Sequence, residues 1–271
     1  MPMPPWMWTR WPTTTWCSAM PMKPRLGNQT ANTVWRSSPD SYPFSNETSI
    51  MTETDTRLLN FQAVEDTPLQ TEPFSFMVAE GVIPSGELER VNADYPYIDI
   101  PANFNPEDLE YGPAFARVLQ DLDSPEFERL IARKFGVDLT RTVKTITVRK
   151  YSEMSDGNIH TDHWSKVITV LLYFNPEWHQ EGGKLRLLRN KHDIEDYVAE
   201  VTPLGGTLLA FKRSGNSYHG YKRFDGERRM VQVNWVRSGP VARQAQRLAR
   251  MGTHTGKRIL RLAQGLRGAA K

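Results

Sequence analysis

The chain has 271 residues, 39% hydrophobic and 24% charged, which is enough apolar material for a folded core. No apolar stretch approaches the roughly 18 residues of a membrane-spanning helix. A single cysteine, Cys17, excludes an internal disulfide framework and a cysteine-rich zinc module. We therefore expect a cytoplasmic protein without a transmembrane segment or a secretory leader.

The net charge of +3 is unevenly distributed along the chain. Residues 240–271 carry eight Lys or Arg and no acidic residue, whereas the first 239 residues hold 26 basic and 31 acidic residues. We predict a basic helical tail over 240–271 that is a solvated face, a contact for an acidic partner or an anchor to an anionic surface. No specific nucleic-acid partner is expected, because cationic clusters attract phosphates only through a salt-sensitive attraction without sequence preference.

Residues 1–50 form an atypical N-terminal segment. They hold five of the eight Trp, eight of the 19 Pro and five of the ten Met, without a periodic apolar pattern. Each Pro removes a backbone donor and restricts the residue before it, so neither a helix nor a paired strand is favoured. We predict a disordered or non-native extension before a domain that spans residues 51–239. An aromatic arm that binds a partner is the alternative.

The first part of that domain contains helical signals. A short β-type run over Phe74–Val78 is followed by a helix start at Pro84. Two stronger helices are predicted over Pro113–Leu122 and Pro125–Phe135, because each has Pro in its first turn and apolar residues at helical spacing. The second ends at Gly136. These are expected to be support helices.

After Leu139 the apolar period changes from 3.6 to 2 for about a hundred residues. Gly-Gly, Asp-Gly, Asn-Pro and Ser-Gly pairs separate the runs. Short strands at this spacing, mostly without helices between them, favour an antiparallel sandwich or jelly roll over a parallel sheet. The predicted strands are Val143–Tyr151, Lys166–Phe174, Lys184–Leu188, Tyr197–Val201, Thr207–Lys212, Ser217–Tyr221 and Arg229–Val236.

Three possible metal ligands lie within the predicted strands. His160 and Asp162 are two residues apart, so in an extended segment both side chains point to the same side. His219, on a later strand, can supply a third ligand. Two imidazoles and one carboxylate form the facial triad of non-haem Fe(II) oxygenases, which leaves positions open for cosubstrate and O₂. The pair alone is weak evidence, and His163 lies close enough to be confused with it.

The predicted turn after His219 determines which face of the next strand carries another candidate, Arg229. With a three-residue Asp-Gly-Glu loop, His219 faces Val233, and Arg229 lies on the same face because it is four residues from Val233. A guanidinium there would suit the far carboxylate of a dianion. A two-residue Asp-Gly turn would bring Arg228 inward instead. The odd positions are also the more apolar set, which favours them as the interior face: Val231, Val233 and Trp235.

Seven sequence elements follow one another between about residues 142 and 237. They are Tyr151, His160-Thr-Asp162, Val170-Leu-Leu-Tyr-Phe-Asn-Pro-Glu-Trp178, Glu181-Gly-Gly-Lys-Leu-Arg-Leu-Leu188, Gly205-Gly-Thr-Leu-Leu-Ala-Phe211, His219 and Arg229. In order and spacing this pattern resembles the 2-oxoglutarate and Fe(II) dependent oxygenases of the prolyl 4-hydroxylase type. The resemblance implies a mainly β fold with support helices, a double-stranded β-helix or jelly roll.

The resemblance also implies roles for single residues. It implies that Arg229 binds the distal carboxylate of 2-oxoglutarate, with a hydrogen bond added by Tyr173, and that Tyr151 lines the cosubstrate pocket. A core position is the alternative for Tyr173, and collagen-type members have Lys in place of Arg229. Three residues are implied to bind Fe(II) and to be catalytic: His160, Asp162 and His219.

The expected activity is hydroxylation of a primary substrate coupled to conversion of 2-oxoglutarate and O₂ into succinate and CO₂. Ascorbate is also expected to take part, by returning oxidised iron to Fe(II). The alternatives are a non-catalytic cupin-like jelly-roll module that binds a metal, and a metal-dependent isomerase. Neither the primary substrate nor the oligomeric state can be read from the sequence, because the loops that determine substrate choice carry no readable code.

Overall fold

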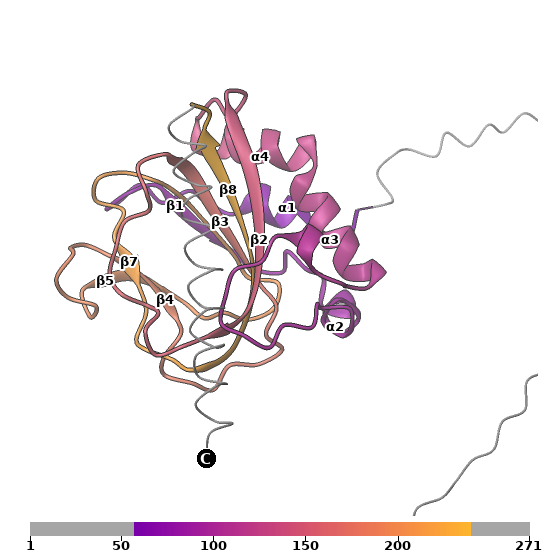
Figure 1. Cartoon of the computed structure of the whole chain (residues 1–271). Helices are drawn as coiled ribbons and strands as arrows, with labels where there is room; N and C mark the ends of the chain where they lie inside the picture. Colours follow the sequence, from indigo (N-terminus) through magenta and orange to yellow (C-terminus); the bar gives the residue numbers. More distant parts are fainter. Residues whose placement is uncertain (1–56, 240–271) are drawn as a thin grey trace, which may run out of the picture. The chain divides into compact units, whose positions relative to one another are not determined.

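The structure is a computed structural model that describes residues 57–239. The predicted extension over 1–50 and the predicted tail over 240–271 lie outside the described residues, so both stay predictions. The described part is a layer of helices against two antiparallel sheets (Figure 1). Within it, no helix combines the length and the apolar character needed to cross a membrane.

The predicted support helices are present, with bounds within a residue or two of those expected. Helix α4 fits best, because Ser124 caps its start by accepting a hydrogen bond from the Phe127 amide (3.1 Å), and Gly136 ends it in the left-handed conformation. Helix α1 was not predicted, since six residues are too short for a periodic signal. The helices are α1 (Phe61–Asp66), α2 (Ser85–Ala93), α3 (Pro113–Asp123) and α4 (Pro125–Phe135), with a 3₁₀ turn at Pro106–Asp108.

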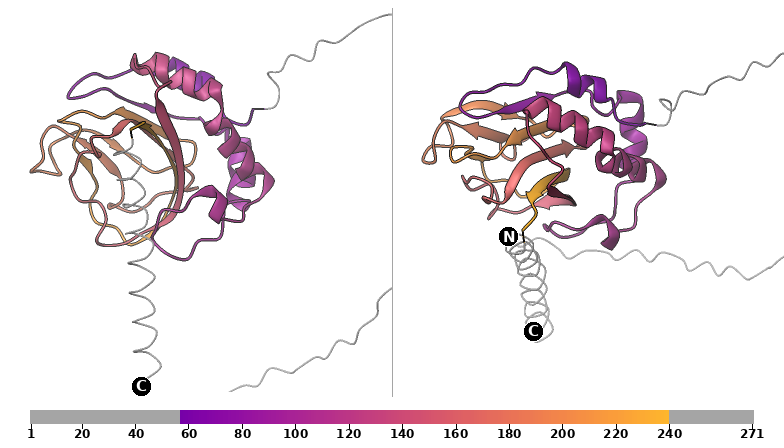
Figure 2. Two further views of the ribbon diagram at one scale, coloured as in Figure 1. Left: turned by 45° about the horizontal axis from the view of Figure 1, so that its top comes forward. Right: turned by 90° about the horizontal axis from the view of Figure 1, so that it is seen from above.

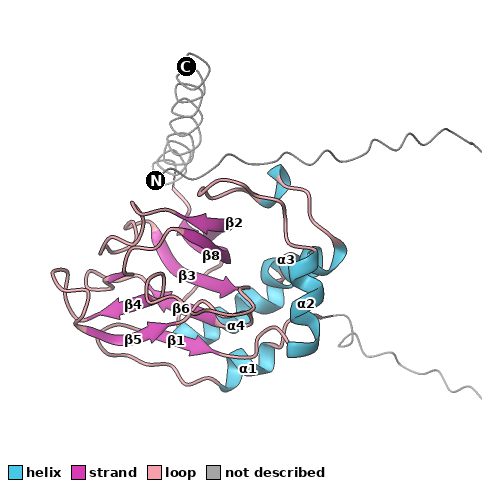
Figure 3. Ribbon diagram, turned by 90° about the horizontal axis from the view of Figure 1, so that it is seen from below, coloured by secondary structure: helices cyan, strands magenta, loops and turns pink. Residues whose placement is uncertain are grey.

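The strands form a five-stranded major sheet of order β1-β6-β3-β8-β2 and a three-stranded minor sheet of order β5-β4-β7. Neighbouring strands in both sheets are antiparallel. This arrangement confirms the predicted double-stranded β-helix (Figure 3). The strands are β1 (Phe76–Ala79), β2 (Thr142–Ser152), β3 (Lys166–Tyr173), β4 (Leu185–Leu188), β5 (Tyr197–Val201), β6 (Leu208–Lys212), β7 (His219–Gly220) and β8 (Gly226–Arg237).

The major sheet is covered on both faces. The helices pack on one face, and the minor sheet lies across the other (Figure 2). Alternate residues of a strand point to opposite faces, so each strand contributes to two cores. The helix-side core contains Val231, Val233 and Trp235 of β8 together with apolar residues of all four α-helices. The inter-sheet core contains Leu171, Tyr173, Leu209, Phe211 and Met230 of the major sheet, with Leu185, Leu187 and Val201 of the minor sheet.

The predicted hairpin between His219 and Arg229 is wrong. Strand β7 pairs with β4 of the minor sheet, where His219 lies opposite Leu187, and β8 pairs with β2 and β3 of the major sheet. The intervening segment therefore crosses from one sheet to the other instead of turning back on itself. Because the two strands are not partners, no turn length can fix which face of β8 carries the functional arginine.

Candidate active site

The structure brings His160, Asp162 and His219 together at one end of a pocket between the two sheets. One possible ligand atom from each lies within 4.8 Å of the other two. His219 comes from β7, and the segment before Asp162 lies beside it, because His160 and His219 form an antiparallel bridge. The cavity has a volume of about 280 Å³. Two imidazoles and a carboxylate on one side of such a cavity are the ligand set of a three-residue facial metal site.

Both imidazoles are oriented by backbone carbonyls. Nδ1 of His219 is 3.0 Å from the carbonyl oxygen of Ser217, and Nδ1 of His160 is 2.8 Å from that of Asn158. A proton on each Nδ1 leaves both Nε2 atoms as lone-pair ligands. Burial lowers the pKa of His219 to about 4, against the opposing effect of Asp162. The ring is therefore neutral at physiological pH, as a metal ligand must be.

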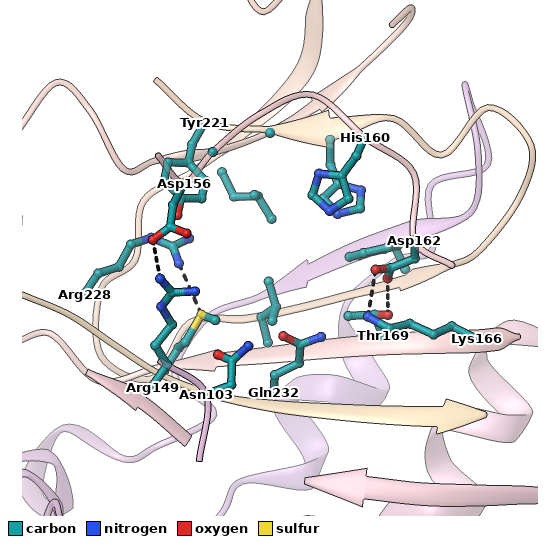
Figure 4. A pocket seen from close by; sticks show the side chains of 17 residues that line it. Asn103, Arg149, Asp156, His160, Asp162, Lys166, Thr169, Tyr221, Arg228 and Gln232 are labelled. Atoms are coloured by element: carbon teal, nitrogen blue, oxygen red, sulfur yellow. Dashed lines mark hydrogen bonds and ion pairs between the residues drawn. The ribbon is translucent and has the colours of Figure 1, made fainter. Parts of the chain in front are cut away.

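Asp162 is held by two side chains that sequence reasoning did not single out. Lys166 Nζ lies 2.7 Å from Oδ1 of Asp162, and the Thr169 hydroxyl donates to Oδ2 at 2.5 Å (Figure 4). Burial acts to raise the pKa of Asp162, but the charge and hydrogen bond of Lys166, the Thr169 hydrogen bond and the nearby His219 hold it below its usual value. Asp162 is therefore ionised in its pocket, so the three residues fit a divalent cation.

The arginine that the structure places in the pocket is Arg228, not the predicted Arg229. Arg228 lines the pocket, whereas the side chain of Arg229 lies outside it. Arg229 forms an ion pair with Glu227, donates to the Asn92 side chain of α2 at 2.8 Å and lies over the ring of Tyr95. The physical reason is that the more apolar, odd-numbered face of β8 packs against the helices, so the even-numbered face points between the sheets.

Arg228 is a buried cation, only 2% exposed, and none of its hydrogen-bond partners within residues 57–239 is a carboxylate. Its Nε donates to the carbonyl oxygen of Gly183 (2.8 Å), and Nη1 lies 3.2 Å from the sulfur of Met230. Gly183 has φ +79°, and a Cβ there would come within 2.6 Å of Trp178, so glycine is required where this carbonyl is presented. No ion pair of Arg228 is recorded within residues 57–239. A buried, unpaired guanidinium favours binding of an anion.

The two tyrosines that are predicted to contact the cosubstrate, Tyr173 and Tyr151, differ in their contacts with Arg228. Arg228 Nη2 donates to the Tyr173 hydroxyl at 3.0 Å. Burial raises the pKa of Tyr173, against the opposing effect of Arg228, so its own proton remains available to donate to a ligand. Neither Tyr173 nor Tyr151 is among the residues that line the pocket, and within residues 57–239 no hydrogen bond joins Tyr151 to Arg228. Tyr221 lines it instead, with its ring 4.6 Å from the Arg228 guanidinium carbon.

Some of the unpredicted pocket residues had a signal in the sequence. In β8 the even positions Arg228, Met230, Gln232 and Asn234 mix polar with apolar side chains inside a buried strand. Such a face is typical of a cavity wall, because buried polar groups persist where they meet other polar groups or a ligand. Lys166 and Thr169 had no comparable signal, since their contacts depend on how the loop after His160 folds.

The fold is a double-stranded β-helix, and one of its pockets holds a three-residue cluster of possible metal ligands together with a buried arginine. Residues 146–237 match the family model of the 2OG-Fe(II) oxygenase superfamily. This match confirms the resemblance seen in the sequence, because residues 146–237 are similar to oxygenases that use Fe(II) and 2-oxoglutarate. No curated protein matches the sequence significantly.

Solved structures with a similar fold include several prolyl hydroxylases. A Pseudomonas putida prolyl-4-hydroxylase is 18% identical, with a TM-score of 0.45, over 66% of this chain and 99% of that one. A Trichoplax adhaerens prolyl hydroxylase, solved with a hypoxia inducible factor peptide, is also 18% identical, with a TM-score of 0.47, over 65% and 89%. The viral collagen prolyl hydroxylase of Paramecium Bursaria Chlorella virus-1 is 14% identical, with a TM-score of 0.41, over 60% and 96%.

Proposed function

We propose that this protein is a dioxygenase in which His160, Asp162 and His219 bind Fe(II), and Arg228 with Tyr173 binds the distal carboxylate of 2-oxoglutarate. The observation that carries the cosubstrate assignment is the buried Arg228, which has no recorded anionic partner in the described residues and shares a pocket with the three ligands. Arginine suits this task because its planar guanidinium pairs with carboxylates in a fork.

The chain's own residues supply binding, orientation and exclusion of water. Carbonyl oxygens of Ser217 and Asn158 fix the two imidazoles, and Lys166 with Thr169 fixes the carboxylate. Arg228 would anchor the distal carboxylate of the cosubstrate in the pocket that it shares with the three metal-ligand candidates. When bound, Fe(II) supplies the redox chemistry by which O₂ converts 2-oxoglutarate to succinate and CO₂ and hydroxylates a C–H bond.

The test compares the two adjacent arginines in the full chain supplied with Fe(II) and 2-oxoglutarate. Wild-type protein is expected to release succinate. Arg228→Ala should raise the 2-oxoglutarate KM by at least about a hundredfold, since removing one partner of a buried charge pair costs about 3 kcal/mol or more. Arg229→Ala, whose contacts are to Glu227 and α2, should change that KM by less than about threefold.

Three results would contradict this proposal. Absence of Fe(II)-dependent succinate formation would leave the binding module or the isomerase as the better reading. A larger KM effect in Arg229→Ala would return the cosubstrate role to Arg229. Iron retention by His160→Ala together with iron loss in His163→Ala would show that the ligand set is wrong, because the Nδ1 of His163 bonds to Ser165 and His163 is not a member of the three-residue cluster.

The proposal extends to a role for ascorbate and to the location of the protein in the cell. Ascorbate restores Fe(II) after turnover without a substrate, and a higher number of 2-oxoglutarate turnovers per protein in its presence is the expected sign. A cytoplasmic location is supported by the single cysteine, because secreted domains more often use disulfides. Fluorescent tagging of the full chain would test that location.

A further inference from the structure

An ion pair that the iron and cosubstrate assignments do not use lines the same pocket. Arg149 of β2 bonds to Asp156 in the loop that follows (Figure 4). The two side chains are only 14% and 21% exposed. Arg149 Nε also donates to the Tyr151 carbonyl oxygen (2.7 Å), and the Glu153 amide donates to Oδ2 of Asp156 (2.9 Å). Within the described residues, Nη1 of Arg149 and Oδ1 of Asp156 have no recorded hydrogen-bond partner.

Further polar groups on the pocket wall also have unused hydrogen-bonding capacity. No hydrogen bond to the Asn103 side chain is recorded within residues 57–239, and Gln232 uses only its Nε2, which donates to Asn234 (2.9 Å). In Figure 4 the Arg149–Asp156 pair lies toward the Arg228 end of the pocket, away from His160 and Asp162. The pocket therefore has a polar wall beyond the groups needed for iron and 2-oxoglutarate.

The charges of the lining residues limit what can bind there. The pocket has three cationic side chains, Arg149, Lys166 and Arg228, and two anionic ones, Asp156 and Asp162, which leaves an excess of one positive charge. Fe(II) and the 2-oxoglutarate dianion cancel each other, so this excess persists in the loaded site. A substrate with a net positive charge is therefore disfavoured.

The ion pair itself favours a group that carries both charges. A carboxylate alone on Arg149 would be repelled by Asp156, and a cation alone on Asp156 would be repelled by Arg149. A carboxylate with an ammonium group beside it satisfies the free Nη1 and the free Oδ1 together. The cavity of about 280 Å³ lies at the small end of ligand pockets and also holds the proposed iron and cosubstrate, so the room beside the Arg149–Asp156 pair favours a small molecule over a long segment.

We propose that Arg149 and Asp156 bind the carboxylate and the ammonium of a free, neutral or acidic α-amino acid, the primary substrate; this inference rests on the proposed function. Because the pair and the metal ligands lie at different ends of the pocket, the carbon that reacts belongs to the amino-acid side chain. Its C–H bond becomes C–OH with one atom of O₂, and the other atom enters succinate as 2-oxoglutarate loses CO₂.

The experiment supplies the full chain, Fe(II) and 2-oxoglutarate with each neutral and acidic L-α-amino acid and with its α-amide, and measures succinate and product mass. At least one amino acid should raise succinate formation about tenfold or more and gain one oxygen atom, and its amide should not. Anaerobic calorimetry of the same amino acid gives its Kd without turnover. Lysine and arginine should bind more weakly than the neutral amino acids.

Two variants and a matched control test the recognition pair. Arg149→Gln and Asp156→Asn should each weaken the amino-acid Kd about tenfold or more, because each loses a charged hydrogen bond. The 2-oxoglutarate KM should change by much less in both. Arg189→Gln removes the arginine of an exposed pair with Asp196 (2.9 Å) and should leave both constants unchanged. Asp156→Asn keeps the side-chain shape, so it remains informative where Arg149→Gln fails to fold.

The outcomes that overturn the inference are distinct from failure of the proposed function. If the protein consumes 2-oxoglutarate but no amino acid stimulates it, or if amides or peptides serve equally well, the substrate class is wrong and the oxygenase assignment stands. If Arg149→Gln raises the 2-oxoglutarate KM as much as the amino-acid Kd, Arg149 belongs to the cosubstrate site. If no succinate forms under any condition, the proposed function itself fails.

Discussion

The two faces of the major sheet show how one set of strands builds stability and chemistry separately. On the helix side, β8 contributes Val231, Val233 and Trp235, which are fully buried among apolar residues of the helices. On the other side, the same strand contributes Arg228, Met230, Gln232 and Asn234 to the space between the sheets. A residue's face, not its neighbourhood in sequence, therefore decides whether it supports the core or the pocket.

The largest expected effect tests the helix-side face. Trp235→Ala should lower the free energy of unfolding by about 3 to 5 kcal/mol, because it removes a fully buried indole and its hydrogen bond to Glu128 (3.0 Å). Its neighbour Asn234 lies on the opposite face, where it accepts hydrogen bonds from Thr169 (3.2 Å) and Gln232 (2.9 Å), and Asn234→Ala should cost only about 1 kcal/mol. Urea denaturation of both variants measures the difference. A greater loss in Asn234→Ala would show that the two faces have been exchanged.

On the pocket side, we expect the free energy of unfolding to depend on pH through His219. The pKa of His219 is about 4 in the folded protein, below its ordinary value of 6.5, so the unfolded chain binds more protons between these values. The contribution of the neutral His219 ring to the free energy of unfolding is therefore fully present above pH 6.5 and is lost as the pH falls toward 4. It amounts to about 3 kcal/mol in metal-free protein.

The measurement is urea unfolding of metal-free protein between pH 8 and pH 4. Asp162 contributes little to the change in this window, because its pKa is lowered from 3.8 and most of its stabilisation is lost below that pH. His219→Gln serves as the matched control and should show a flatter profile, since the variant lacks the titrating ring. Equal slopes in the two proteins would mean that His219 is not a buried neutral imidazole.

The smallest effect concerns one hydroxyl on β3. Thr169→Val keeps the side-chain shape but removes the hydrogen bond to Asp162, and it should weaken Fe(II) binding by about 10- to 100-fold. Ile168 is the adjacent residue on the helix-side face, and Ile168→Val should cost about 1 kcal/mol of stability without changing iron affinity. Anaerobic Fe(II) titration of both variants measures the two iron affinities. Equal iron affinities would remove Thr169 from the support of the site.

Most elements of the fold and the types of the candidate metal ligands can be predicted from the sequence. Strands Tyr197–Val201 and Lys166–Tyr173 and helix Pro125–Phe135 follow from period, capping and proline position, which are local properties of the chain. The His160-Thr-Asp162 pattern with a later histidine was readable for the same reason, since it depends on residue type and order. The match of residues 146–237 to an oxygenase family rests on that order too.

Which arginine enters the pocket depends on how the two sheets and the helices pack together. Alternation along β8 separates Arg228 from Arg229 but does not say which face meets the helices, because both faces of the major sheet are buried. The more apolar face is the one against the helix layer, and pairing of β7 with β4 removes the turn that seemed to fix the register. Lys166 and Thr169 contact Asp162, and Arg149 contacts Asp156, across only four to seven residues, but period does not predict these contacts because packing sets the path of each loop.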